Sequence, residues 1–133
     1  MLSCHHMEET KQKRSVLIVD DEESLTNVLA RKFTDEGIIA YTAYDGKQGL
    51  ELALEKHPDV ILLDIMMPEM DGFDVMKALQ QDPWGKDVPV ILLTNSSSLD
   101  TVAKAVTSGM SEFLVKTEMK LDQVVDHVKR RFE

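Results

Sequence analysis

Short apolar runs alternate with longer stretches of helical periodicity from Ser15 to the end of the chain. Most of the runs are rich in β-branched residues, and continuous apolar runs of this kind are typical of strands that are covered on both faces. We therefore expect five strands, at residues 16–19, 38–43, 60–63, 90–93 and 113–115.

The stretches between and after the runs place apolar residues every three or four positions, which predicts amphipathic helices with one face in the core. The five faces consist of Leu25, Val28, Leu29 and Phe33; Leu50, Ala53 and Leu54; Phe73, Met76 and Leu79; Leu99, Val102, Ala103 and Val106; and Leu121, Val124, Val125, Val128 and Phe132. Gly37 and Gly109 stand where helices should end. Asp45, together with Gln48, and Asp71 are expected to cap helices.

Five strands that alternate with five helices predict one α/β domain, because each crossover between parallel strands is right-handed and places a helix against the sheet. The expected architecture is a doubly wound, five-stranded parallel sheet of flavodoxin-like order 2-1-3-4-5. Ligands in such folds bind at the carboxyl ends of the strands, near the first and third strands. We assign residues 14–133 to this domain and residues 1–13, which show no periodicity, to a disordered or tag-derived leader.

Composition and charge narrow the functional classes. The chain has 133 residues, a size that suits one domain, and no apolar stretch approaches the roughly 20 residues of a membrane-spanning helix. Its formal net charge of -9 argues against binding to nucleic acid or anionic lipid and leaves room for a cation. The single cysteine, Cys4, has no disulfide partner in the chain. We expect a cytoplasmic protein without membrane insertion and without nucleic-acid binding through this domain.

Polar residues stand at the carboxyl ends of four expected strands: Asp20 and Asp21, Asp64, Thr94 and Lys116. Each has an ordinary structural explanation, since acids are favoured in the first turn of a helix and the other side chains can satisfy a loop or lie in solvent. Converging carboxylates would repel, however, because a pair about 4 Å apart at an effective dielectric near 20 costs roughly 4 kcal/mol. A magnesium ion removes this cost, since it prefers carboxylate oxygens, and Lys116 can offset the charge without the metal.

Phosphoryl transfer suits such a group of side chains. The reaction needs little from a protein except an in-line nucleophile and positive charge near the equatorial oxygens. Asp64 is the candidate nucleophile, because a carboxylate can attack phosphorus to give an acyl phosphate. We expect magnesium, Lys116 and the Thr94 hydroxyl each to meet one of the transferred oxygens.

The segments VLIVDDEES, PDVILLDIMMPEMDG, PVILLTN and EFLVK carry these residues, and in this order they resemble the receiver domain of two-component response regulators, including chemotaxis receivers. The resemblance covers residues 14–132. It implies that a sensor histidine kinase or a phosphotransfer protein phosphorylates Asp64 in a Mg2+-dependent reaction. It also implies a protein-interaction surface that switches on phosphorylation, an unidentified downstream protein target, and no enzymatic turnover.

The same resemblance implies a role for each residue of the site. These residues are the phosphoacceptor Asp64; the Mg2+ ligands Asp20, Asp21, Asp64 and, through its backbone carbonyl, Met66; and the phosphoryl-binding and switch residues Thr94, Lys116 and Phe113.

Two positions depart from the family pattern. Receivers commonly follow the lysine with a proline in a cis bond, whereas this chain has Thr117, and a cis bond before a non-proline residue costs about 2.5 to 4 kcal/mol. The loop is therefore either trans or strained, and Thr117 is also a candidate cap for the last helix. Asn95 is larger than the small residue often found beside the threonine, so we expect narrower access to the acyl phosphate.

Two other functions fit parts of the pattern. A haloacid-dehalogenase-like phosphatase also uses Asp, Thr, Lys and magnesium, but its nucleophile follows the first strand and a second Asp comes two residues later, where this chain has Glu22. A phosphorylation-independent pseudo-receiver, used as an interaction module, is the closer alternative, although such modules often lose an acid or the lysine.

Overall fold

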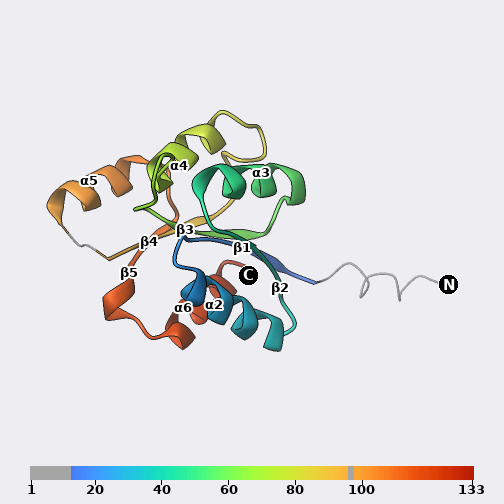
Figure 1. The fold of residues 1–133 in the computed structure, drawn as a ribbon. Coiled ribbons are helices and arrows are strands. Elements are labelled where there is room, and N and C mark those ends of the chain that lie inside the picture. Colours follow the sequence, from blue (N-terminus) through green and yellow to red (C-terminus); the bar gives the residue numbers. More distant parts are fainter. Residues whose placement is uncertain (1–12, 96–97) are drawn as a thin grey trace.

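The computed structural model describes residues 13–95 and 98–133, and its centre is one parallel sheet of order β2-β1-β3-β4-β5 (Figure 1). The strands are β1 (Ser15–Val19), β2 (Ile39–Ala43), β3 (Val60–Asp64), β4 (Val90–Thr94) and β5 (Glu112–Val115). The predicted order is confirmed, and each predicted strand end lies within one residue of the observed one. The expected leader lies outside the described residues apart from Lys13.

Helices cover both faces of the sheet (Figure 1). They are α2 (Glu23–Asp35), α3 (Gly46–Lys56), α4 (Gly72–Gln80), α5 (Leu99–Thr107) and α6 (Leu121–Arg130), with a short 3-10 helix, η1 (Lys116–Glu118), before α6. Figure 1 shows α2 and α6 on one face and α3, α4 and α5 on the other. Among the described helices, none has the length and apolar character needed to span a bilayer.

The three central strands, β1, β3 and β4, bury both of their faces, as their continuous apolar sequences predict, whereas the edge strands β2 and β5 are mostly half-buried. Val16 and Ile18 of β1 pack with Phe33 in the core layer under α2 and α6, whereas Leu17 and Val19 belong to the layer under α3 and α4. Alternate side chains of a strand point to opposite faces, so one short apolar run contributes to two cores.

Most predicted helix ends are confirmed. Gly37 and Gly109 have positive φ values of 80° and 92°, a conformation that glycine adopts at little cost. Asp71 caps α4 in a reciprocal capping box with Asp74, with N–O distances of 2.9 and 3.0 Å. The side chain of Asp45 accepts a hydrogen bond from the Gln48 backbone N–H at 2.7 Å and caps α3.

Some predictions about helices are wrong. The residues that were expected in the core but are exposed are Leu99 (87%), Val106 (66%), Val28 (45%), Leu54 (40%) and Ala103. Ala105 is the buried residue of α5. Thr117 does not cap α6, because it lies within η1 and Lys120 precedes the helix. The described peptide bonds include no cis bond, so the bond between Lys116 and Thr117 is trans.

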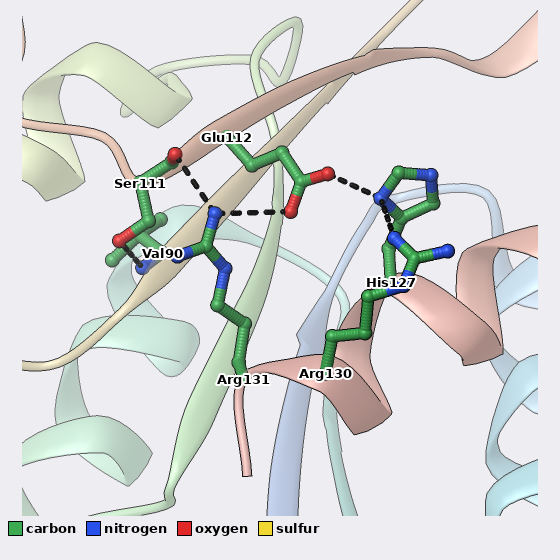
Figure 2. Close-up of polar contacts among 6 residues, drawn as sticks. All are labelled: Val90, Ser111, Glu112, His127, Arg130 and Arg131. Atoms are coloured by element: carbon green, nitrogen blue, oxygen red, sulfur yellow. Dashed lines mark hydrogen bonds and ion pairs between the residues drawn. The ribbon is translucent and has the colours of Figure 1, made fainter. Parts of the chain in front are cut away.

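A polar cluster joins the start of β5 to the end of α6 (Figure 2). The Glu112 carboxylate contacts Nδ1 of His127 and accepts a hydrogen bond from Arg131 at 3.2 Å. Arg131 also donates to the backbone carbonyl of Ser111 at 3.1 Å. Because β5 is an edge strand, these contacts tie the edge of the sheet to the C-terminal helix.

Candidate functional site

The register of the sheet brings the predicted site residues together. Val19 of β1 pairs with Leu63 of β3, so Asp20 and Asp64 follow at neighbouring positions. One carboxylate oxygen from each of Asp20, Asp21 and Asp64 lies within 4.8 Å of the others. The expected cluster of three acids at the carboxyl edge of the sheet is therefore present.

Asp20 is held in one orientation by its own loop. Its side chain is fully buried, its Oδ1 accepts a hydrogen bond from the Glu22 N–H at 2.9 Å, and its backbone N–H donates to Ala43 at 3.1 Å. The Thr26 hydroxyl donates to the carbonyls of Asp20 and Glu22, each at 3.1 Å. These bonds direct Oδ2 of Asp20 toward the cluster, where it meets Lys116.

Lys116 reaches into the cluster from the end of β5. Its Nζ lies 2.7 Å from Oδ2 of Asp20, 3.5 Å from Oδ1 of Asp64 and 3.8 Å from Oε1 of Glu22. Burial alone would lower the pKa of Lys116, but the carboxylates around it, Asp20 first and then Asp64, raise its pKa above the usual value. The ammonium group therefore stays charged and partly balances the acids.

Asp64 is buried at the end of β3, with 3% of its surface exposed. The pKa of Asp64 is raised to about 7, mainly by burial and next by the negative charge of Asp20. The positive charge of Lys116 opposes this increase. Near neutral pH this carboxyl group is thus poised between its neutral and charged forms.

The loop after β3 packs closely on Asp64. The Gly72 N–H donates to the Ile65 carbonyl at 2.9 Å, and a Cβ atom at position 72 would lie 2.6 Å from the Asp64 carbonyl oxygen. A glycine is therefore required where α4 begins beside the site. Met66 lies in this loop, two residues after Asp64, with its side chain 66% exposed.

The remaining predicted residues lie on β4 and β5. Thr94 is fully buried at the end of β4 and pairs in register with Val115, the residue before Lys116. Phe113 is half-buried and packs against the core under α3 and α4. Asn95 is exposed and helps to line a cavity of about 220 Å³ that also includes Lys116 and Thr117.

Two residues of the site, Glu22 and Thr26, were not expected to act there. Glu22 was considered as the position where a phosphatase would have its second Asp, yet its backbone N–H orients Asp20 and its carboxylate faces Lys116. Thr26 is fully buried and fixes the loop through its hydroxyl. A threonine in the first turn of a helix could have been recognised, because its hydroxyl commonly bonds the carbonyl one turn back.

The acid cluster fits a divalent cation. Although Nζ of Lys116 is close, Oδ2 of Asp20 accepts no hydrogen bond of good geometry from the described residues. The Lys116 ammonium balances the negative charge of this buried oxygen, and a lone pair remains that a metal can take. Three carboxylates at one edge are the hard oxygen ligands that Mg2+ prefers, with water and phosphate oxygens completing its shell.

Comparison with proteins of known sequence agrees with this geometry. The family model described as response regulator receiver domain matches residues 16–129. The response regulator PleD of Caulobacter vibrioides is 42% identical over 101 residues, which are 76% of this chain and 22% of PleD. The probable transcriptional regulator ycf27 of Guillardia theta is 41% identical over 111 residues, which are 81% of this chain and 41% of that protein. The chain thus spans well under half the length of these two curated relatives.

Solved structures show the same fold. The chemotaxis protein CheY4 of Vibrio cholerae superposes with a TM-score of 0.82 at 30% identity, covering 89% of this chain and 98% of that chain. The receiver domain of the Francisella response regulator 1452 gives a TM-score of 0.81 at 30% identity, covering 90% and 97%. With a family model that matches most of its length, this chain belongs to the response regulator receiver domain family.

Proposed function

We propose that Asp64 accepts a phosphoryl group from a sensor histidine kinase or a phosphotransfer protein, and that the acyl phosphate changes a surface read by a downstream protein. The observation that carries this proposal is the meeting of a buried carboxyl, two further acids and a buried lysine at one edge of the sheet. Residues 14–133 form the receiver domain in this proposal, and a cytoplasmic location without nucleic-acid contact through this domain belongs to it.

The proposed reaction uses a deprotonated Asp64. One of its oxygens attacks the phosphorus of the donor, a new P–O bond forms, and the bond from phosphorus to the donor breaks, with the electron pair leaving on the donor. Because the pKa of Asp64 is about 7 without a metal, a sizeable fraction of the group is ionised at neutral pH. Burial limits the access of water to the product.

The surrounding groups stabilise the transferred charge. Asp20, Asp21, Asp64 and the Met66 carbonyl would hold Mg2+, which supplies positive charge to the phosphoryl oxygens when bound. Lys116 exchanges its contact with Asp64 for one with a phosphoryl oxygen, and the Thr94 hydroxyl donates to another. Phe113 lies on β5, which ends directly before Lys116, and we propose that it follows this rearrangement as the switch residue.

Receiver domains are generally signalling modules, and we propose that this one stores a signal and does not turn over a substrate. No observation favours a phosphorylation-independent pseudo-receiver, since the two acids that follow β1, the acid at the end of β3 and the lysine are all in place.

Intact-mass spectrometry tests the proposal. Incubation with a small phosphodonor such as acetyl phosphate, in the presence of Mg2+, is expected to add the mass of one phosphoryl group to the wild-type protein. EDTA and Asp64→Asn should each abolish the addition, whereas Asp59→Asn, a matched change of an acid before the amino end of β3, should not. Phosphorylation that persists in Asp64→Asn would contradict the assignment of the acceptor.

A further inference from the structure

A groove runs between α4 and α5, outside the candidate site, and has a volume of about 440 Å³. Its walls include Phe73, Met76, Lys77 and Gln80 from α4 and Lys104 and Thr107 from α5. None of these residues is used by the proposed phosphoryl chemistry.

The floor of the groove is apolar and carries a half-buried aromatic ring. Met76 is 1% exposed, and Phe73 packs against the core with part of its ring left accessible. The Nζ atom of Lys104 lies 4.9 Å from the centroid of the Phe73 ring, so a cation from α5 covers the ring from the other wall. An incoming apolar side chain can contact this ring if Lys104 turns toward a carboxylate.

The charge of the groove is opposite to that of the chain. The side chains that line it are positive or neutral, with Lys77 and Lys104 as its two cations, although the chain carries a formal net charge of -9. Within the described residues, neither lysine forms an ion pair, whereas Lys116 is paired with Asp20. Binding an anion here breaks no existing ion pair.

We propose that this groove binds an acidic segment of a partner protein. Carboxylates of the segment pair with Lys77 and Lys104, and a large apolar side chain packs on Phe73 and the floor around Met76. Nucleic acid does not suit the groove, because two lysines give little counterion release and the rest of the surface repels phosphates. The groove has room for a short segment, which predicts a small interface with affinity in the micromolar range.

Both walls of the groove begin at the carboxyl edge of the sheet, close to the candidate site. α4 starts at Gly72, which packs on the Asp64 backbone, and α5 begins five residues after Thr94. The groove is therefore placed to respond to changes at that edge. Its recognition of an acidic segment, however, rests on its own charge and shape and does not require phosphorylation of Asp64.

Selection from a random peptide library tests the proposal without a known partner. We expect peptides selected on the wild-type protein to be acidic and to contain a large apolar residue. In fluorescence anisotropy, their affinity should fall at least about tenfold for the double variant Lys77→Glu/Lys104→Glu, which corresponds to about 1.4 kcal/mol. The matched control Lys47→Glu/Lys86→Glu changes the net charge equally at two exposed lysines outside the groove and should bind like the wild type.

Several outcomes would overturn the proposal. These are the absence of selected binders, selection of neutral or basic peptides, and equal binding to the groove variant and the wild type. Circular dichroism and thermal unfolding must show that the groove variant is folded, and Lys77→Gln/Lys104→Gln serves as a milder second variant. Sedimentation must not show self-association that the groove variant abolishes, because the occupant would then be a second copy of this chain. Binding to phosphatidylserine vesicles that the groove variant abolishes would make the occupant a membrane. In either case the partner-segment proposal is wrong.

Discussion

Burial and the charge of Asp20 hold the pKa of Asp64 at about 7 in the metal-free protein, well above its value of 3.8 in an unfolded chain. The folded state therefore binds this proton more tightly, and its stability should fall as pH rises from about 4 to about 7. Asp64→Asn carries no such proton. We expect the free energy of unfolding of Asp64→Asn to exceed that of the wild type by an amount that grows through this pH range.

The expected gain is about 2 kcal/mol at pH 8, roughly half of what a pKa of about 7 in place of 3.8 implies, because the surroundings of a buried charge relax. Urea unfolding in EDTA at several pH values measures it. Adding Mg2+ to the wild type should shrink the gap, since the cation favours the charged carboxylate. A gap that is constant between pH 4 and pH 8 would show that Asp64 is not the group responsible.

At the same scale, the sequence predicted that Asp20, Asp21, Asp64 and Lys116 come together, but not how they are held. Strand ends in a known order are enough to bring Asp20, Asp64 and Lys116 together. The orientation of Asp20, in contrast, depends on the Glu22 N–H and the Thr26 hydroxyl, and these bonds form only once α2 begins at a particular residue. Helix starts are hard to place from sequence to within one residue, so the two supporting residues were missed.

Among the elements, α5 departs most from its predicted packing. Its apolar residues repeat at helical spacing, which predicts an amphipathic helix correctly but does not say which side faces the sheet. In the structure the buried side is centred on Ala105, flanked by the half-buried Val102 and Ser108, while Leu99 and Val106 point outward. A small residue at the contact lets a helix lie close to the sheet. The side of α5 that carries Ala105 therefore faces the sheet, although the apolar stripe predicted from the sequence is wider and includes larger residues.

The cluster around Glu112 should stabilise the edge of the sheet through α6 (Figure 2). Glu112 is partly buried, with 22% of its side chain exposed, and it contacts both His127 and Arg131. We expect Glu112→Gln to lower the free energy of unfolding by about 1 kcal/mol, because two charge-assisted contacts are weakened while the shape is kept. Urea unfolding at low ionic strength measures this loss.

Glu36→Gln is the matched control for Glu112→Gln. Glu36 pairs with Lys129 at 2.6 Å and also links a neighbouring element to α6, but 44% and 47% of the two side chains are exposed, about twice the fraction of Glu112. Exposed pairs of this kind contribute little to stability. If the two changes lower the free energy of unfolding equally, burial of the Glu112 cluster adds nothing to stability.

At the scale of the whole molecule, the alternation of strands and helices was sufficient to predict the fold. Both core layers are drawn from the same short strands, so the pattern of β1, β3 and β4 leaves few other ways to bury them. The charge of the site is less well balanced: Asp20 and Asp64 are buried, Asp21 is exposed beside them, and Lys116 is the one cation that the described residues place among these acids. Folding without a metal therefore depends on this lysine.

Lys116→Met tests that dependence. Removing the ammonium leaves Asp20, Asp21 and Asp64 without their internal cation, so the metal-free protein should unfold at a lower temperature at pH 8. Magnesium should restore more stability to this variant than to the wild type, because in the wild type the ion must displace Lys116 from the carboxylate oxygens it would bind. A tenfold gain in Mg2+ affinity at saturating concentration adds about 1.4 kcal/mol to the free energy of unfolding, or roughly 5 °C to the thermal midpoint.

Lys86→Met, at an exposed lysine, is the control and should show the wild-type response to magnesium. If magnesium raises the midpoints of all three proteins equally, the cation and Lys116 do not share the same carboxylates, and the cation lies elsewhere.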